Sequence, residues 1–212
     1  MANELHVFVS SQPPLSPSST NNLTALYKPF SDITNASLRH ALDESDASLS
    51  DEEVAKLMKA YDSLGTFPDV PPALTSLASD PSISAYVFSN GTDLMVSSSV
   101  NHSPSLSSHA SVFKGLITVQ EIGVYKPDPR VYHHLAAKVG KEREMGSIWL
   151  VSGNPFDIVG ARAVGMQAAW VDRAGKGWTD KLGTLTGGGP TVVGKGVEEA
   201  VEAIRKWTKN GA

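Results

Sequence analysis

Polar residues that could perform chemistry stand just beyond apolar runs of this sequence or just before a proline-rich segment. These residues are Ser89, Asn90, Lys126, Ser152, Asn154 and Asp157. Hydroxyl and amide groups at a helix start can hold a carboxylate or a developing oxyanion, and a lysine with an aspartate can balance charge or move protons. Open α/β sheets place ligands at the carboxyl ends of their strands, so a site is expected where these runs end.

The apolar runs predict the strands that position these residues. Strands are expected near 83–88, 115–119, 147–151 and 167–172, with helices between them, and a short strand is expected at 191–193. Strands that alternate with helices indicate an α/β fold with a parallel sheet. The last helix is expected at 197–207. The Ser-rich stretch 101–111 and the glycine-rich tract inside 183–196 are interpreted as loops.

The first third of the chain has a different character. Residues 12–22 form a connector rich in proline and serine, and 23–46 shows one apolar helical face. Ser50 followed by Glu53 is a capping box that opens a second amphipathic helix. These residues predict a small helical unit inserted after a first strand at 5–12.

Together, Ser89-Asn90, Lys126 and Ser152-Gly-Asn154-x-x-Asp157 resemble three motifs of the haloacid dehalogenase superfamily, in that family's order. More narrowly they are similar to its type II 2-haloacid dehalogenase branch, and the resemblance covers roughly residues 27–180. It implies a Rossmann-like three-layer core with a parallel sheet and a small helical cap. The core would be 1–11 and 69–212, and the reduced cap 12–68.

The resemblance also implies roles for the catalytic candidates. Ser89 and Asn90 would bind the substrate or nucleophile carboxylate, and Lys126 would pair with the nucleophile. Asp157 would help to orient an attacking water. Each role has a plainer alternative: Ser-Asn-Gly is good turn chemistry, Lys126 could be a solvated loop lysine, and Asp157 could complement a helix dipole.

Further residues are substrate-binding candidates by resemblance. Ser152 and Asn154 would orient the water with Asp157. Phe156 would line the pocket, and Phe30 and Tyr27 would supply its cap wall. Tyr132 either donates its phenol to a substrate carboxylate or packs on its helix.

The family's first motif, a strand ending in the nucleophile aspartate, has no counterpart in this sequence. Val9 or Ser10 takes its place, and no aspartate occurs before Asp32. The natural partner of Lys126 then becomes Asp157. With Asn154 where phosphatase members carry an acid, too few carboxylates remain for a Mg²⁺ site, so no metal and no cofactor are expected.

Composition limits the partners. Apolar residues make up 41% of the 212, charged residues 19%, and the net charge of −4 comes without a basic cluster. We therefore expect a small-molecule substrate, anionic or carbonyl-bearing, and neither nucleic acid nor membrane as partner. The absence of cysteine excludes disulfides and thiolate zinc sites. With no span-length apolar segment and no signal-like N-terminus, a cytoplasmic protein is expected, as a monomer or a homodimer formed through the cap helices.

Several functions stay open from the sequence. The first is a metal-free enzyme of the haloacid dehalogenase-like hydrolase family that uses non-covalent acid/base chemistry, such as dehydration, isomerisation or cyclisation of a carbonyl or carboxylate compound. The second is an inactive binding protein that keeps the pocket. The third is 2-haloacid hydrolysis by a relocated carboxylate such as Asp32. A variant transcript that alters the N-terminus is a fourth explanation.

Overall fold

The protein is seen in a computed structural model that describes residues 3–7, 27–61 and 65–210. The described strands form one parallel six-stranded sheet in the order β3-β2-β1-β4-β5-β6. Their bounds are β1 Asn3–Val7, β2 Ile83–Ser89, β3 Phe113–Thr118, β4 Ile148–Ser152, β5 Gln167–Val171 and β6 Val192–Gly194. The α/β prediction with a parallel sheet is confirmed, and β2 to β6 lie within about two residues of the predicted strands. The first strand was expected at 5–12, whereas β1 begins at Asn3 and residues 8–12 lie outside the described residues.

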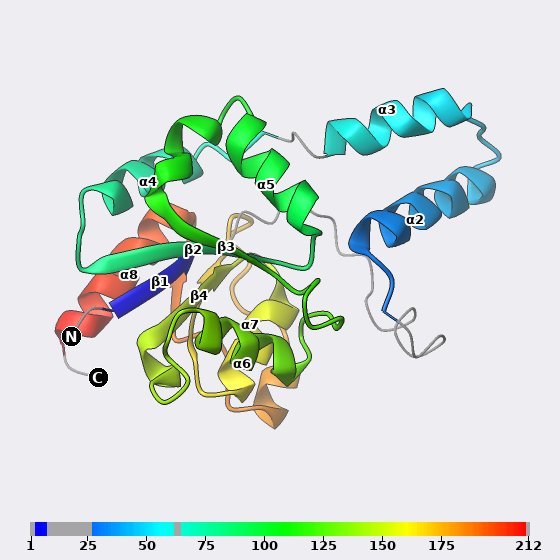
Figure 1. Ribbon diagram of the computed structural model, residues 1–212. Coiled ribbons are helices and arrows are strands. Elements are labelled where there is room, and N and C mark those ends of the chain that lie inside the picture. The colour runs from blue at the N-terminus through cyan, green and yellow to red at the C-terminus, as the bar shows by residue number, and fades with distance from the viewer. Residues whose placement is uncertain (1–2, 8–26, 62–64, 211–212) are drawn as a thin grey trace.

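Two layers of helices sandwich the sheet, as Figure 1 shows. The helices are α2 Phe30–Glu44, α3 Asp51–Tyr61, α4 Val70–Ala78, α5 Asp93–His102, α6 Pro129–Lys138, α7 Pro155–Ala163 and α8 Val197–Lys209. Apolar residues of α4, α5 and α8 form one buried cluster with the sheet, and those of α6 and α7 form a second. Alternate residues of β4 belong to the two clusters, because successive side chains of a strand face opposite ways. Trp149 and Val151 are in the first cluster, and Ile148 and Leu150 are in the second.

Local sequence explains how the site-bearing helices begin. The Thr92 side chain accepts the N–H of Met95 at 3.2 Å and caps α5. Asp128 accepts the N–H of Arg130 at 2.9 Å, with Pro129 as the first residue of α6. Both follow the preference for an oxygen-bearing cap, and proline suits the first helical turn because it has no N–H to satisfy. The predicted helix starts at these positions are confirmed.

Helices α2 and α3 lie side by side and extend away from the sheet (Figure 1). The predicted capping box of α3 is present: Glu53 accepts the N–H of Ser50 at 2.8 Å, and Ser50 Oγ accepts the N–H of Glu53 at 3.3 Å. The helix expected at 23–46 is shorter, because 27–29 are not helical, while 23–26 lie outside the described residues. The division into core and cap, and dimerisation through the cap helices, stay predictions.

The prediction of a loop at the Ser-rich stretch 101–111 is wrong. The stretch contains the end of α5 at His102 and a 3-10 helix, η1, at Ser107–Val112, where a loop was expected. Packing with side chains outside the stretch decides this structure, because Leu106 is buried at 3% exposure in the cluster that includes residues of α4 and α5. Tertiary burial therefore overrides the local preference of serine for loops.

Candidate functional site

A buried ion pair forms the centre of the candidate site. Lys126 Nζ lies 3.0 Å from Asp157 Oδ1, and the two residues are 4% and 0% exposed. Lys126 lies in the segment before α6, whereas Asp157 is in the first turn of α7. Burial lowers the pKa of the Lys126 ammonium, and the Asp157 carboxylate partly opposes that effect. The predicted partnership of Lys126 with Asp157 is thus present in the structure.

Ser152 fixes the carboxylate of this pair. Its Oγ donates to Asp157 Oδ2 at 2.8 Å and accepts the N–H of Asn154 at 3.0 Å. Ser152 is the last residue of β4 and is 1% exposed, so the hydroxyl is held between the strand end and the start of α7. The turn therefore presents one aspartate with both carboxylate oxygens already oriented, as a general base or an electrostatic group requires.

The end of β2 holds the lysine. Asn90 Oδ1 accepts the N–H of Lys126 at 2.9 Å, and the carbonyl oxygen of Phe88 accepts from Lys126 Nζ at 3.4 Å. The same ammonium lies 5.0 Å from the centre of the Phe88 ring, within cation–π range. Ser89 Oγ accepts the N–H of Gly91 at 3.0 Å, which is the turn role weighed for it above. Asn90 acts on the lysine backbone, and substrate binding by either residue stays a prediction.

Tyr132 packs inside the core. It is 0% exposed, its hydroxyl donates to the backbone carbonyl of Asp157 at 3.4 Å, and its ring lies edge-on to Phe88 at 5.8 Å. A Cβ on Gly160 would lie 2.5 Å from Tyr132 Cζ, so this glycine gives the ring its space. Burial, and then the charge of Asp157, raise the pKa of the phenol well above its usual range. This geometry agrees with the packing alternative and gives Tyr132 no substrate-facing position.

The aromatic candidates gather around a residue that the sequence reasoning did not select. Tyr125 packs against Tyr27 at 5.2 Å and Phe30 at 6.0 Å between ring centres, and its hydroxyl donates to the Lys28 carbonyl. Burial raises the pKa of the Tyr125 phenol. Tyr27 and Phe30 thus cover the segment that carries Lys126. Phe156 is half-buried beside Asp157, and its pocket-lining role stays a prediction.

Comparisons with known proteins agree with these motifs. No protein-family model matches the chain. Haloacetate dehalogenase H-2 of Moraxella sp. (strain B) is 30% identical over 161 residues, which are 76% of this chain and 68% of that protein. The chain belongs to the haloacid dehalogenase superfamily, in its type II 2-haloacid dehalogenase branch.

Other members of this haloacid dehalogenase family give the same picture. The (S)-2-haloacid dehalogenase of Pseudomonas sp. (strain YL) is 30% identical over 149 residues, 70% of this chain and 61% of that enzyme. The chain therefore spans about two thirds of the length of these curated relatives. The L-2-haloacid dehalogenase of Xanthobacter autotrophicus with chloropropionic acid covalently bound superposes with a TM-score of 0.79 at 20% identity, covering 97% of this chain and 99% of that one. That likeness confirms the Rossmann-like fold.

The first motif of the haloacid dehalogenases cannot be located in the described part of this chain. Val9 and Ser10, which take its place in the sequence, lie outside the described residues. The preceding strand is present as β1 and lies at the centre of the sheet between β2 and β4, where it would deliver such a residue to the site. Asp32, the relocated carboxylate considered above, is an exposed residue of α2.

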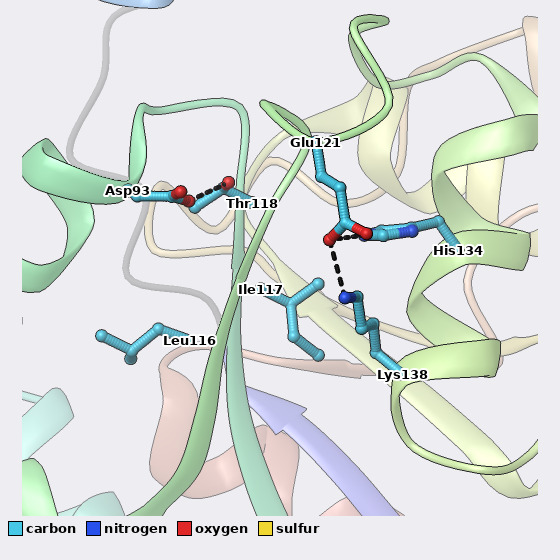
Figure 2. A pocket seen from close by; sticks show the side chains of 7 residues that line it. All are labelled: Asp93, Leu116, Ile117, Thr118, Glu121, His134 and Lys138. Carbon is cyan, nitrogen blue, oxygen red and sulfur yellow. Dashed lines mark hydrogen bonds and ion pairs between the residues drawn. The ribbon is translucent and has the colours of Figure 1, made fainter.

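A separate cavity of about 260 Å³ lies at the β3 edge of this dehalogenase-like core, and Figure 2 shows its lining. Glu121 accepts from Lys138 at 2.6 Å and lies 3.8 Å from His134, while Asp93 accepts the Thr118 hydroxyl. His40 likewise has an acidic neighbour, since its Nε2 lies 3.5 Å from Glu44. The lining shares no residue with the Lys126–Asp157 pair.

Among the described residues, no three His, Asp or Glu side chains are grouped so as to hold a metal ion. No helix within the described ranges is long and apolar enough to cross a membrane. The cytoplasmic location stays a prediction.

Proposed function

We propose that this protein hydrolyses the carbon–halogen bond of a small 2-halo-carboxylate, with Asp157 as the base that activates water. The observation that carries this proposal is the buried Lys126–Asp157 pair, held at one end by Ser152 and at the other by Asn90. Curated relatives of this chain are named as dehalogenases of haloacetate and (S)-2-haloacids. A preorganised carboxylate in a dry environment is suited to receive a proton from water.

The proposed reaction balances without a covalent intermediate. The water oxygen forms a bond to the carbon that carries the halogen, and halide leaves with the bonding pair. Asp157 takes the proton from the water and later releases it to solvent, so the products are a 2-hydroxy-carboxylate, a halide ion and a proton. Lys126 stabilises the ionised carboxylate before the proton arrives. The absence of any aspartate before Asp32 in the sequence favours this route over an aspartyl ester at the first motif.

Halide release tests the proposal directly. The full chain is incubated with chloroacetate and with each enantiomer of 2-chloropropionate, and free halide is measured over time. Replacing Asp157 with Asn is expected to lower kcat by about 10²–10⁴-fold, the usual contribution of a general base. Lys138→Met serves as the matched control, because Lys138 pairs with a carboxylate at the β3 edge and lies outside the proposed site. No release from any substrate, or full release by Asp157→Asn, would refute the proposal.

Isotope labelling separates direct attack from an ester route. With enzyme in excess and a single turnover in heavy-oxygen water, direct attack places the heavy oxygen in the hydroxy-acid. An ester route through a protein carboxylate, Asp32 included, delivers unlabelled oxygen to the first product. Labelled product supports the direct route, and unlabelled product transfers the chemistry to a nucleophilic carboxylate.

A second candidate function rests on the same ion pair. A lysine and an aspartate in contact can act as an acid and a base for dehydration, isomerisation or cyclisation of a carbonyl or carboxylate compound. The sequence without an early aspartate favours this candidate as much as direct hydrolysis. Turnover of such a compound without halide release, lost in Lys126→Met, would support it. Ligand binding without turnover would instead support the binding-protein alternative.

A further inference from the structure

The segment that leads from α3 back into the core is fastened by one ion pair. Arg173 donates from Nε to Asp69 Oδ1 and from Nη2 to Asp69 Oδ2, both at 2.9 Å. Asp69 Oδ2 also accepts the N–H of Val197, the first residue of α8, at 2.7 Å. A two-pronged guanidinium–carboxylate contact fixes orientation as well as distance. The linker at residues 65–69 is therefore held to the end of β5 and to the start of α8.

Arg173 contacts the linker a second time and lies next to the site turn. Its guanidinium stands 4.1 Å from the centre of the Phe67 ring, a close cation–π distance. On another side, a Cβ built on Gly153 would lie 3.8 Å from Arg173 Nη1. Gly153 is between Ser152, which orients Asp157, and Asn154. One side chain thus contacts the returning linker and lies close to Gly153 in the turn that carries the site.

We propose that Arg173 is a positioning residue of the hydrolase: it couples the linker at 65–69 to the turn at 152–154, so that the helices α2 and α3 meet the substrate in register with the Lys126–Asp157 pair. The inference rests on the proposed function for its kinetic consequence alone. A lysine in place of Arg173 would keep the positive charge. It could not form the two-pronged contact with Asp69 or stack on Phe67 in the same way.

The chain supplies a matched control in Arg205. This arginine of α8 donates from Nε to Asp80 Oδ2 at 3.0 Å and from Nη1 to Ser76 Oγ at 2.9 Å. The side chains of this pair are 25% and 24% exposed, against 29% and 24% for Arg173 and Asp69. Both pairs join distant parts of the core, but among the described residues Arg205 bonds to Ser76 and Asp80 and not to the linker or the site turn. A merely stabilising role predicts similar effects for both arginines.

Amide hydrogen exchange of the full chain tests the coupling without any substrate. Arg173→Met is expected to raise exchange about tenfold or more both at 66–70 and at 154–158, where the amides of Asn154 and Asp157 are bonded within the site turn. Arg205→Met is expected to raise exchange near residues 76–83 alone. Faster exchange at the linker with no change at 154–158 would overturn the proposal, as would equal effects of the two substitutions. If Arg173→Met does not fold, amide exchange at 66–70 and at 154–158 is measured in Arg173→Lys and Asp69→Asn instead.

Kinetics give the second readout. Arg173→Met is expected to raise KM for 2-chloropropionate about tenfold and to change kcat less than about threefold, because the ion pair itself is untouched. A loss of folded protein would lower apparent kcat at an unchanged KM, and that result would overturn the positioning role. Arg173→Lys is expected to fall between wild type and Arg173→Met in KM. If wild type releases no halide, the proposed hydrolysis fails, whereas the exchange comparison still decides the role of Arg173.

Discussion

Removing the ammonium from the centre of the site should destabilise the fold strongly. Lys126→Met keeps the length of the side chain but leaves the carboxylate of Asp157 buried at 0% exposure beside an apolar group. Removing one partner of a buried ion pair costs about 3–5 kcal/mol, because the remaining charge has lost its compensation. The Ser152 hydroxyl continues to donate to Asp157 Oδ2 and limits the cost to the lower part of that range. Urea denaturation at pH 7 measures the free energy of unfolding.

A double-mutant cycle shows whether the ion pair is the cause. Lys126→Met combined with Asp157→Asn removes both charges, so the double variant should lose about 1–3 kcal/mol less than the sum of the two single variants. Lys138→Met, at the exposed pair with Glu121, should stay within about 0.5 kcal/mol of wild type. A cost below about 1 kcal/mol for Lys126→Met, or strict additivity in the cycle, would refute the reasoning from burial and charge.

Three further predictions concern the core, the linker and the cap helices. Gly160→Ala should cost about 1–3 kcal/mol in urea denaturation, since its Cβ would overlap the ring of Tyr132, whereas Gly153→Ala, which meets nothing closer than 3.5 Å, should be nearly neutral. Partial burial opposes the ionisation of Asp69, but its hydrogen bonds to Arg173 and Val197 outweigh burial and hold its pKa below 3.8. Wild type should therefore have a higher free energy of unfolding than Asp69→Asn above pH 3.8, and this difference should vanish as pH falls through the lowered pKa of Asp69. A difference between the two proteins that persists at lower pH would contradict this. Ser50→Ala should lower the local stability of α3 by about 1 kcal/mol, measured as faster amide exchange at 53–57, and unchanged exchange there would show that the capping box contributes nothing.

The sheet and the helix starts could be predicted because they follow from local patterns. The continuous apolar run at 148–151 is fully buried in β4, and Asp128 with Pro129 opens α6 as the cap preferences require. The stretch 101–111 was predicted less well, because its structure depends on the burial of Leu106 in the cluster that includes residues of α4 and α5. Local composition carries no information about that cluster.

The candidate site was predicted in part. The partnership of Lys126 and Asp157 could be inferred, since both residues lie in motifs that a parallel sheet brings to one edge. The burial of Tyr132 could not, because its space depends on Gly160 in another helix. Tyr125 had one local signal, an aromatic residue immediately before the lysine, but its contacts with Tyr27 and Phe30 arise only from the fold.

The linker contact shows why such residues escape sequence reasoning. Asp69 and Arg173 are 104 positions apart, and neither belongs to a recognisable motif. Their spacing follows no helical or strand period, so only the assembled sheet brings them together. A guanidinium directly after a predicted strand, at the ligand-binding edge, is the one signal that could have selected Arg173.

The central place of β1 has a consequence for how this polypeptide is made. Its five residues precede both neighbouring strands in the sequence, and they are flanked by β2 at 83–86 and by β4 at 148–151. Until β4 has been synthesised, one edge of β1 lacks the strand with which it pairs in the finished sheet. Nascent chains should therefore expose an unpaired strand edge until translation passes about residue 152, and the long-range pairing of β1 with β4 should make folding of the sheet slow compared with formation of any single helix.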